Sequence, residues 1–308
     1  MLLVFDSSQG TPLPVQGPLP ARGWVHAESP SQAELDILQR SGIPGSLFPH
    51  ALDKDELARV DYTDGVMLVV IRVPCRGGED DAIPYRTTSL ALLIIGELVV
   101  TISCRPSDVV AGVLQLRDPA IATAERLLPR LLLETARHFL RFVGEVEARV
   151  ERLEEQLQVS QRNREVIGLL RYQKALVHFT TGLASNAIML DQLSRDPHHT
   201  LAGLDRELME DVTVEFHQAM EVNRIQEEIL SQMMDAFASI ISNNLNVVVK
   251  VLTGLTIVMS IPTMFASFYG MNVTLPGQQH PAAFAGVLVL STIGAAAMAL
   301  WFARKHWF

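Results

Sequence analysis

The sequence predicts an α+β membrane protein with a mixed α/β domain, a long helical stalk and two C-terminal transmembrane helices. Strand-like apolar runs occur before about residue 115, and helical periodicity dominates from about residue 119 onward. Residues 251–303 contain no Asp, Glu, Lys or Arg. We therefore expect an α/β domain at 1–118, a stalk at 119–246 and a transmembrane part at 247–308.

The first part contains five runs of β-branched and apolar residues that predict strands, namely 2–5, 23–26, 66–73, 89–95 and 98–103. The last two flank Gly96 and Glu97, a hairpin signal. Ser31 and Glu34 have the spacing of a capping box, which predicts a helix start, and a second short helix is expected at 45–52. We find no phosphate-binding glycine loop, nucleophile elbow or zinc-protease motif, so we do not expect an enzyme.

Charge is divided unevenly along the chain. The formal net charge is −9, but residues 247–308 hold three basic residues and no acids, so residues 1–246 carry a net −12. An acidic part of this kind does not suit a nucleic-acid-binding protein. Its carboxylates would attract divalent cations, or they would serve only solubility. Two cysteines, Cys75 and Cys104, form neither a zinc cluster nor a disulfide framework and suit a reducing cytoplasm.

The middle of the chain predicts long helices. Apolar residues recur there at spacings of four, three and four, at Val146, Val150, Leu153 and Leu157. Breaks are expected at 160–163 and 196–199. No Pro or Gly lies between residues 204 and 250, which predicts one helix from about residue 204 to 268, roughly 95 Å long. Such a helix needs partners from this chain or from copies of it, and a membrane-anchored coiled-coil protein would show the same pattern.

The uncharged stretch forms two predicted membrane spans, at about 247–269 and 282–303. Their apolar cores, 251–268 and 282–303, provide 18 and 22 residues, close to the roughly 20 that cross ~30 Å of hydrocarbon. Basic residues flank the spans at Lys250, Arg304 and Lys305, and none lies in 270–281. The positive-inside rule therefore puts both termini in the cytoplasm, and we expect a multi-pass protein of the cell (inner) membrane.

Hydroxyl residues in the first span follow a helical period. Spacings of three and four put five of them on one face, at Thr253, Thr256, Ser260, Thr263 and Ser267. Leu255, Val258 and Phe265 occupy other faces. The stripe fits the wall of a water-filled path, and it equally fits a seam where small residues let helices pack closely.

Four residues at the end of this span, Tyr269-Gly270-Met271-Asn272, carry a resemblance. Together with residues 246–253 and 261–269, the motif resembles the CorA-type magnesium channel family. Segments 23–26, 43–44 and 51–56 are similar to the cytoplasmic domain of that family. The resemblance covers essentially the whole chain.

The resemblance implies a funnel-shaped homopentamer with a cytoplasmic α/β domain, embedded in the bilayer, that takes up Mg²⁺. The first span of each subunit lines the pore in this family and the second forms an outer ring. The implied pore-lining residues are Asn246, Val249, Leu252, Thr253, Thr256, Ser260, Thr263 and Ser267. Val249 and Leu252 would form an apolar constriction, which stops ions by dewetting.

The resemblance also assigns a cation filter to Gly270, Met271 and Asn272. Mg²⁺ releases its waters reluctantly, so a filter should bind the hydrated ion. Five Asn272 carbonyls would accept hydrogen bonds from those waters without a formal charge; alternatively, Asn272 is only a helix C-cap. The loop at 273–280 has no acid and the C-terminal tail is weakly basic, and both features depart from much of the family.

In the family, Mg²⁺ bound between cytoplasmic domains of adjacent subunits closes the channel. The matching stalk positions are Asp211 and Asp235, and the candidates near the N-terminal domain are Asp53 and Asp55. Each of these four is equally consistent with an ordinary solvated surface acid.

Two alternatives remain. One is a transporter of the same family for Zn²⁺, Co²⁺ or Ni²⁺, of which zinc would require His or Cys at ligand spacing. The only such cluster is His198-His199, in a predicted surface loop. The other is a membrane-anchored coiled-coil sensor without transport. It would explain the spans but not the hydroxyl stripe or the motif at 270–272.

Overall fold

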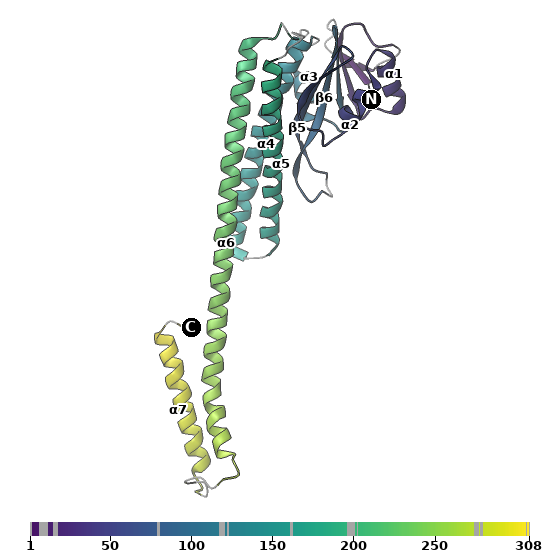
Figure 1. Cartoon of the computed structure of the whole chain (residues 1–308). Helices are drawn as coiled ribbons and strands as arrows, with labels where there is room; N and C mark the ends of the chain where they lie inside the picture. Colours follow the sequence, from purple (N-terminus) through teal and green to yellow (C-terminus); the bar gives the residue numbers. More distant parts are fainter. Residues whose placement is uncertain are drawn as a thin grey trace. The chain divides into compact units, whose positions relative to one another are not determined.

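The computed structural model describes residues 2–5, 12–14, 18–78, 81–116, 121, 123–160, 163–195, 201, 203–273, 277, 280–305 and 307. The chain divides into two compact units, Met1–Gln232 and Met233–Phe308. One helix, α6 (Arg206–Tyr269), runs through both (Figure 1). We describe each unit by itself.

The first unit contains a seven-stranded sheet with the order β2-β1-β3-β7-β6-β5-β4. Its strands are β1 (Leu2–Phe5), β2 (Pro12–Pro14), β3 (Gly23–Glu28), β4 (Arg59–Thr63), β5 (Val66–Arg76), β6 (Tyr85–Ile95) and β7 (Leu98–Ser103). Neighbouring strands are antiparallel except β3 and β7, which are parallel. The predicted hairpin is confirmed, because Ile95 pairs with Leu98 and Gly96 has a φ of +56°.

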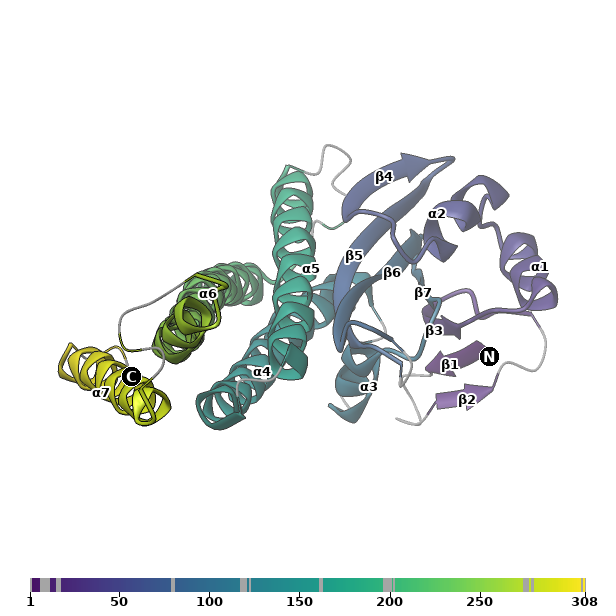
Figure 2. The ribbon, with the colours of Figure 1, turned by 90° about the horizontal axis from the view of Figure 1, so that it is seen from below.

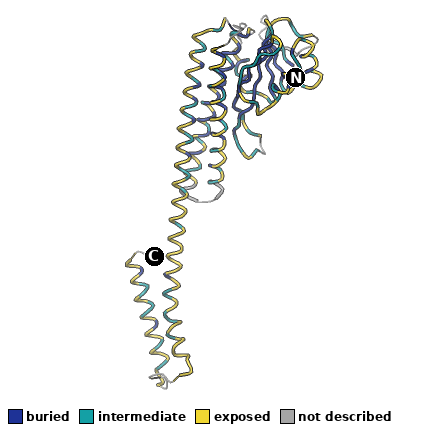
Figure 3. Tube along the Cα trace, viewed as in Figure 1, coloured by how far each residue is buried: buried dark blue, intermediate teal, exposed yellow. Residues whose placement is uncertain are grey.

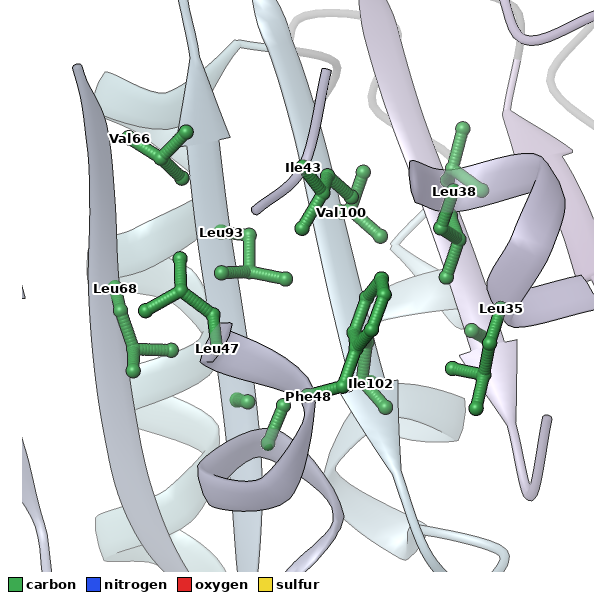
Figure 4. Close-up of a cluster of buried hydrophobic side chains, with 14 of the residues drawn as sticks. Leu35, Leu38, Ile43, Leu47, Phe48, Val66, Leu68, Leu93, Val100 and Ile102 are labelled. Carbon is green, nitrogen blue, oxygen red and sulfur yellow. The ribbon is translucent and has the colours of Figure 1, made fainter. Parts of the chain in front are cut away.

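One face of the sheet is covered by three short helices, α1 (Gln32–Arg40), the 3₁₀ helix η1 (Gly45–Leu47) and α2 (Phe48–Leu52) (Figure 2). Leu38, Leu47 and Phe48 pack with Leu93 and Val100 of the strands in one buried cluster (Figure 4). The predicted capping box starts α1. The backbone N–H of Ser31 donates to Glu34 Oε2 at 2.8 Å.

The other face of the sheet is covered by α4 (Ala124–Ser160) and α5 (Asn163–Ser194) (Figure 2). Phe139 and Phe179 meet edge to face there, with their ring centroids 5.4 Å apart. Tyr85 Oη donates to Glu145 Oε2 at 2.7 Å, which joins β6 to α4. A Cβ on Gly182 would lie 2.9 Å from Thr87 Cγ2, so a glycine is needed where α5 approaches β6.

The stalk helices α5 and α6 are joined in this unit by polar contacts that run from the buried Asn223 to the exposed surface. Asn223 Nδ2 donates to Thr180 Oγ1 at 2.7 Å and to the Leu176 carbonyl at 3.3 Å. Thr180 Oγ1 donates to Glu227 Oε2 at 2.9 Å.

Because α6 extends without interruption from Arg206 to Tyr269, the prediction of one helix from about residue 204 to 268 is confirmed.

Three elements were not predicted from the sequence. β2 is an edge strand with a proline at each end, which only an edge tolerates. β4 is the opposite edge strand and mixes polar with apolar residues. Helix α3 (Asp108–Gln115) precedes the predicted helical region, and Ser107 is its N-cap, whose Oγ accepts from the Val110 N–H at 3.4 Å. The break predicted at 160–163 agrees with the end of α4 at Ser160 and the start of α5 at Asn163. The break predicted at 196–199, with His198-His199, lies outside the described residues.

The second unit contains the rest of α6 and helix α7 (Ala283–Arg304). Both helices are long and apolar enough to cross a membrane, and 6% of the most apolar window of each is buried by this chain. Most of this unit is exposed (Figure 3). Apolar surface on this scale requires a bilayer or further copies of the chain to cover it.

Candidate cation pathway

Five hydroxyl residues lie on one face of α6, within its membrane-spanning part. Thr253, Thr256, Ser260, Thr263 and Ser267 are all exposed in the single chain. Three of these hydroxyls donate to a carbonyl of their own helix: Thr256 Oγ1 to Leu252 at 2.8 Å, Ser260 Oγ to Ile257 at 2.7 Å and Thr263 Oγ1 to Met259 at 3.1 Å. Their protons are therefore used within the helix, and the oxygens present lone pairs to the outside.

A different face of α6 contacts α7. A Cβ on Gly294 of α7 would lie 3.2 Å from Ile261 Cγ2 and 3.9 Å from Phe265 Cε2. Gly254 is buried, and Ile257, Val258, Ile261 and Phe265 are half-buried, so they share this side. At 100° per residue, the mean direction of this set differs from that of the hydroxyl set by about 135°. The hydroxyl stripe is therefore not the seam between these two helices.

The inner part of the stripe is also uncovered in the single chain. Asn246 is exposed, and Val249 and Leu252 have exposed fractions of 52% and 62%. Exposure alone does not select these residues, because apolar side chains such as Leu255 and Met259 are exposed too. The pore-lining role of the eight residues therefore stays a prediction.

The motif at 270–272 lies where α6 ends. The Gly270 N–H donates to the Ala266 carbonyl at 2.9 Å, and the Met271 N–H donates to the Phe268 carbonyl at 3.3 Å, which closes the last turn. Asn272 is exposed and lies three residues beyond Tyr269, the last helical residue. This position does not favour the C-cap interpretation of Asn272, since the cap position is taken by Gly270.

The four predicted sensor acids are exposed and lie in two groups. Asp211 and Asp235 lie on α6, roughly 36 Å apart along the helix. Asp53 and Asp55 follow α2, and the Asp55 N–H donates to Asp53 Oδ1 at 2.9 Å. Among the described residues, no three His, Cys, Asp or Glu side chains come together in an arrangement that would hold a metal ion. A metal site at these four acids therefore stays a prediction.

Comparison with known proteins then identifies the family. The model of the CorA-like Mg²⁺ transporter protein family matches residues 23–305. The chain belongs to this family. A family of transporters agrees with the expectation that the chain is not an enzyme.

Among relatives of this CorA-family chain is the cobalt/magnesium transport protein CorA of Methanocaldococcus jannaschii. It is 28% identical over 293 residues, which cover 92% of this chain and 90% of the relative. The complete structure of the CorA magnesium transporter from the same organism matches with a TM-score of 0.84 and 26% identity, and the match covers 100% of this chain and 99% of that one. The predicted fold class is thereby confirmed: an N-terminal α/β domain, a long helix and two C-terminal apolar helices.

A more distant solved structure is similar in fold alone. The full-length CmaX protein matches with a TM-score of 0.70 at 18% identity, and the match covers 99% of this chain and 96% of that one.

The small size of Gly294 in an apolar span predicts that it packs against a neighbouring helix, and in this CorA-family chain it contacts Ile261 of the first span. Arg72 was missed by the sequence analysis. Arg72 is the single charged residue of the predicted strand 66–73, and its side chain is buried. A lone charge inside an apolar strand was the signal that it has a specific task.

Proposed function

We propose that five copies of this chain form a transmembrane pore that carries hydrated Mg²⁺, with the first span of each copy lining the path. The observation that carries this proposal is the hydroxyl stripe on α6, which faces away from α7 and exposes oxygen lone pairs. The waters of a hydrated cation are hydrogen-bond donors, so acceptors along the wall suit a cation. An anion would require donors, and the Thr256, Ser260 and Thr263 protons are already used within α6.

The filter in this proposal is a ring of Asn272 side chains at the outer end of the path. Their carbonyl oxygens accept from the waters of Mg²⁺ without the tight hold of a carboxylate, so the ion can leave again. Gly270 contributes backbone close to the ion, and Met271 packs the motif against a neighbouring subunit. Val249 and Leu252 form the inner constriction. The substrate class extends to Co²⁺, Ni²⁺ or Zn²⁺, which the transport assay below compares.

Regulation in this proposal depends on cytoplasmic Mg²⁺. The ion bridges Asp211 or Asp235 of one subunit and Asp53 or Asp55 of the next, and it thereby holds the closed state. Both termini are cytoplasmic, since the basic residues that flank the spans lie on that side. The division into an α/β domain at 1–118, a stalk at 119–246 and a transmembrane part at 247–308 belongs to the same proposal.

The test is metal flux into liposomes that contain the purified protein, with Mg²⁺, Co²⁺, Ni²⁺ and Zn²⁺ compared. We expect Mg²⁺ flux from the unmodified protein and at least a tenfold loss in Asn272→Ala, with the oligomer unchanged in size. Val273→Ala is the matched control, because Val273 is the next exposed residue and lacks a polar group. Unmodified flux from a correctly assembled Asn272→Ala protein would refute the filter assignment.

A further inference from the structure

A buried arginine lies beneath the loop that carries Asp53 and Asp55. Arg72 belongs to β5, and 7% of its surface is exposed. Its Nη1 donates to the carbonyls of Lys54 at 2.7 Å and Glu56 at 3.0 Å. Its Nη2 donates to the carbonyl of Thr87 at 2.9 Å and to Thr87 Oγ1 at 2.7 Å. All four acceptors are uncharged, so this guanidinium is buried without the usual benefit of a direct ion pair.

The loop above Arg72, residues 53–56, is held at several carbonyls. Ser89 of β6 donates through Oγ to the Asp53 carbonyl and through its N–H to the Lys54 carbonyl, the latter at 3.1 Å. Just before the loop, Cys104 Sγ donates to the Leu52 carbonyl at 2.8 Å. Arg72 is the donor that joins the middle of the loop to its end, since one nitrogen contacts the carbonyls of both Lys54 and Glu56. These two carbonyls lie on either side of Asp55.

The loop presents its acids outward while its backbone is fixed from below. Asp53 and Asp55 are exposed, and the hydrogen bond from the Asp55 N–H to Asp53 Oδ1 keeps them adjacent. Burial lowers the pKa of the Arg72 guanidinium, and the negative charges of Asp55 and Asp53 oppose that effect.

We infer that Arg72 is the positioning residue of the 53–56 loop and that it thereby sets the Mg²⁺ affinity of the cytoplasmic site to which Asp53 and Asp55 contribute. The inference rests on the proposed function, which makes these acids part of that site. A loop that is ordered before the ion arrives loses little conformational freedom on binding. The planar guanidinium of arginine is needed to position the loop, because its two terminal nitrogens donate to the carbonyls of two loop residues and of Thr87 at once.

The experiment compares Arg72→Lys with Asn186→Ala in the full-length protein in detergent. Lysine keeps the positive charge but has a single nitrogen in place of the guanidinium, so the loop loses some of the hydrogen bonds that Arg72 donates to it. Asn186 of α5 is the matched control because it binds the backbone of the same residue. Its Oδ1 accepts from the Arg72 N–H, and its Nδ2 donates to the Arg72 carbonyl, both at 2.8 Å. Removal of Asn186 weakens the attachment of β5 to α5 and leaves the contacts of the guanidinium with the loop in place.

Two quantities are measured for each variant. The first, called the midpoint, is the Mg²⁺ concentration that gives half of the full protection against protease, and the second is the Tm without Mg²⁺. We expect Arg72→Lys to raise the midpoint about tenfold. Asn186→Ala should lower the Tm at least as much as Arg72→Lys does, and it should leave the midpoint unchanged. An equal midpoint shift in both variants would mean that Arg72 is merely structural and would overturn the inference. If Arg72→Lys does not fold, Thr87→Val replaces it, since it removes one acceptor and should raise the midpoint by a smaller factor; an unchanged midpoint there would also overturn the inference.

A further variant separates the inference from the proposal beneath it. Asp53→Asn combined with Asp55→Asn should raise the midpoint more than Arg72→Lys does. If this acid variant shifts the midpoint and Arg72→Lys does not, the inference alone fails. If the acid variant leaves the midpoint unchanged, these acids are not part of the site, and the proposed regulation by this loop fails together with the inference.

Discussion

Cysteine substitutions along the first span test which face of α6 is wet. Each variant carries one new cysteine in a background with Cys75→Ala and Cys104→Ser, where serine keeps the hydrogen-bond donor to Leu52. The first set replaces the five hydroxyl residues of the stripe. The second set replaces the residues that face α7, namely Gly254, Ile257, Val258, Ile261 and Phe265. Leu255, exposed in the single chain but apolar, represents a surface that we expect to face lipid.

The expected contrast follows from the ionisation of the thiol. A wet thiol with a pKa of about 8.5 is roughly a tenth ionised at pH 7.5, and only the thiolate reacts. An apolar environment that raises the pKa by about two units lowers the ionised fraction about 100-fold. We therefore expect the stripe cysteines to react about 100-fold faster than those facing α7 or at Leu255, before any loss of reagent access is counted.

The assay is the rate of modification by a small charged thiol reagent added to liposomes that contain each variant. The rates should rise and fall with the helical period and be highest at residues 253, 256, 260, 263 and 267. The period matters more than any single rate, because a local distortion changes one position and not five. Equal rates on the two faces, or the fastest rates on the side that faces α7, would refute the pore-lining role of this stripe.

Three further predictions follow from other parts of the molecule. Asp211→Lys should raise the Mg²⁺ concentration needed for protease protection several-fold, because lysine turns a bridge between subunits into repulsion; an unchanged protection curve would count against a sensor at Asp211. Gly294→Leu should disrupt the contact with Ile261 and lower the yield of assembled protein by size-exclusion chromatography, whereas Gly286→Ala, with open space at its Cβ, should assemble normally. Burial lowers the pKa of His26 to about 4. Between pH 6.5 and 4 the unfolded chain therefore binds a proton that the folded chain does not, and the free energy of unfolding should decrease by about 1.4 kcal/mol for each unit by which the pH is lowered. His26→Gln should remove this slope in urea unfolding of the full-length protein, and an unchanged slope would show that another group causes it.

Sequence patterns predicted correctly those elements that depend on residues close together in the chain. The capping box at Ser31 and Glu34, the hairpin at Gly96 and the long uninterrupted helix each depend on residues close in sequence, and the structure confirms all three. β2 and β4 were missed because edge strands are stabilised on one side only and tolerate proline or mixed polarity. In such strands the alternation that marks a half-buried strand is absent or weak.

The sequence by itself determined the two apolar spans, the hydroxyl stripe and the motif at 270–272, because composition and period are properties of neighbouring residues. Only the tertiary structure decided which face of α6 is covered by α7 and which donors hold the loop at 53–56. The Gly294 contact joins residues about 30 positions apart. Arg72 of β5 and Ser89 of β6 reach the loop at 53–56 from two different strands, and Cys104, just after β7, contacts Leu52 immediately before that loop. Contacts of this kind depend on strand register and helix rotation, which are decided by packing of the whole unit and are not encoded in any local window.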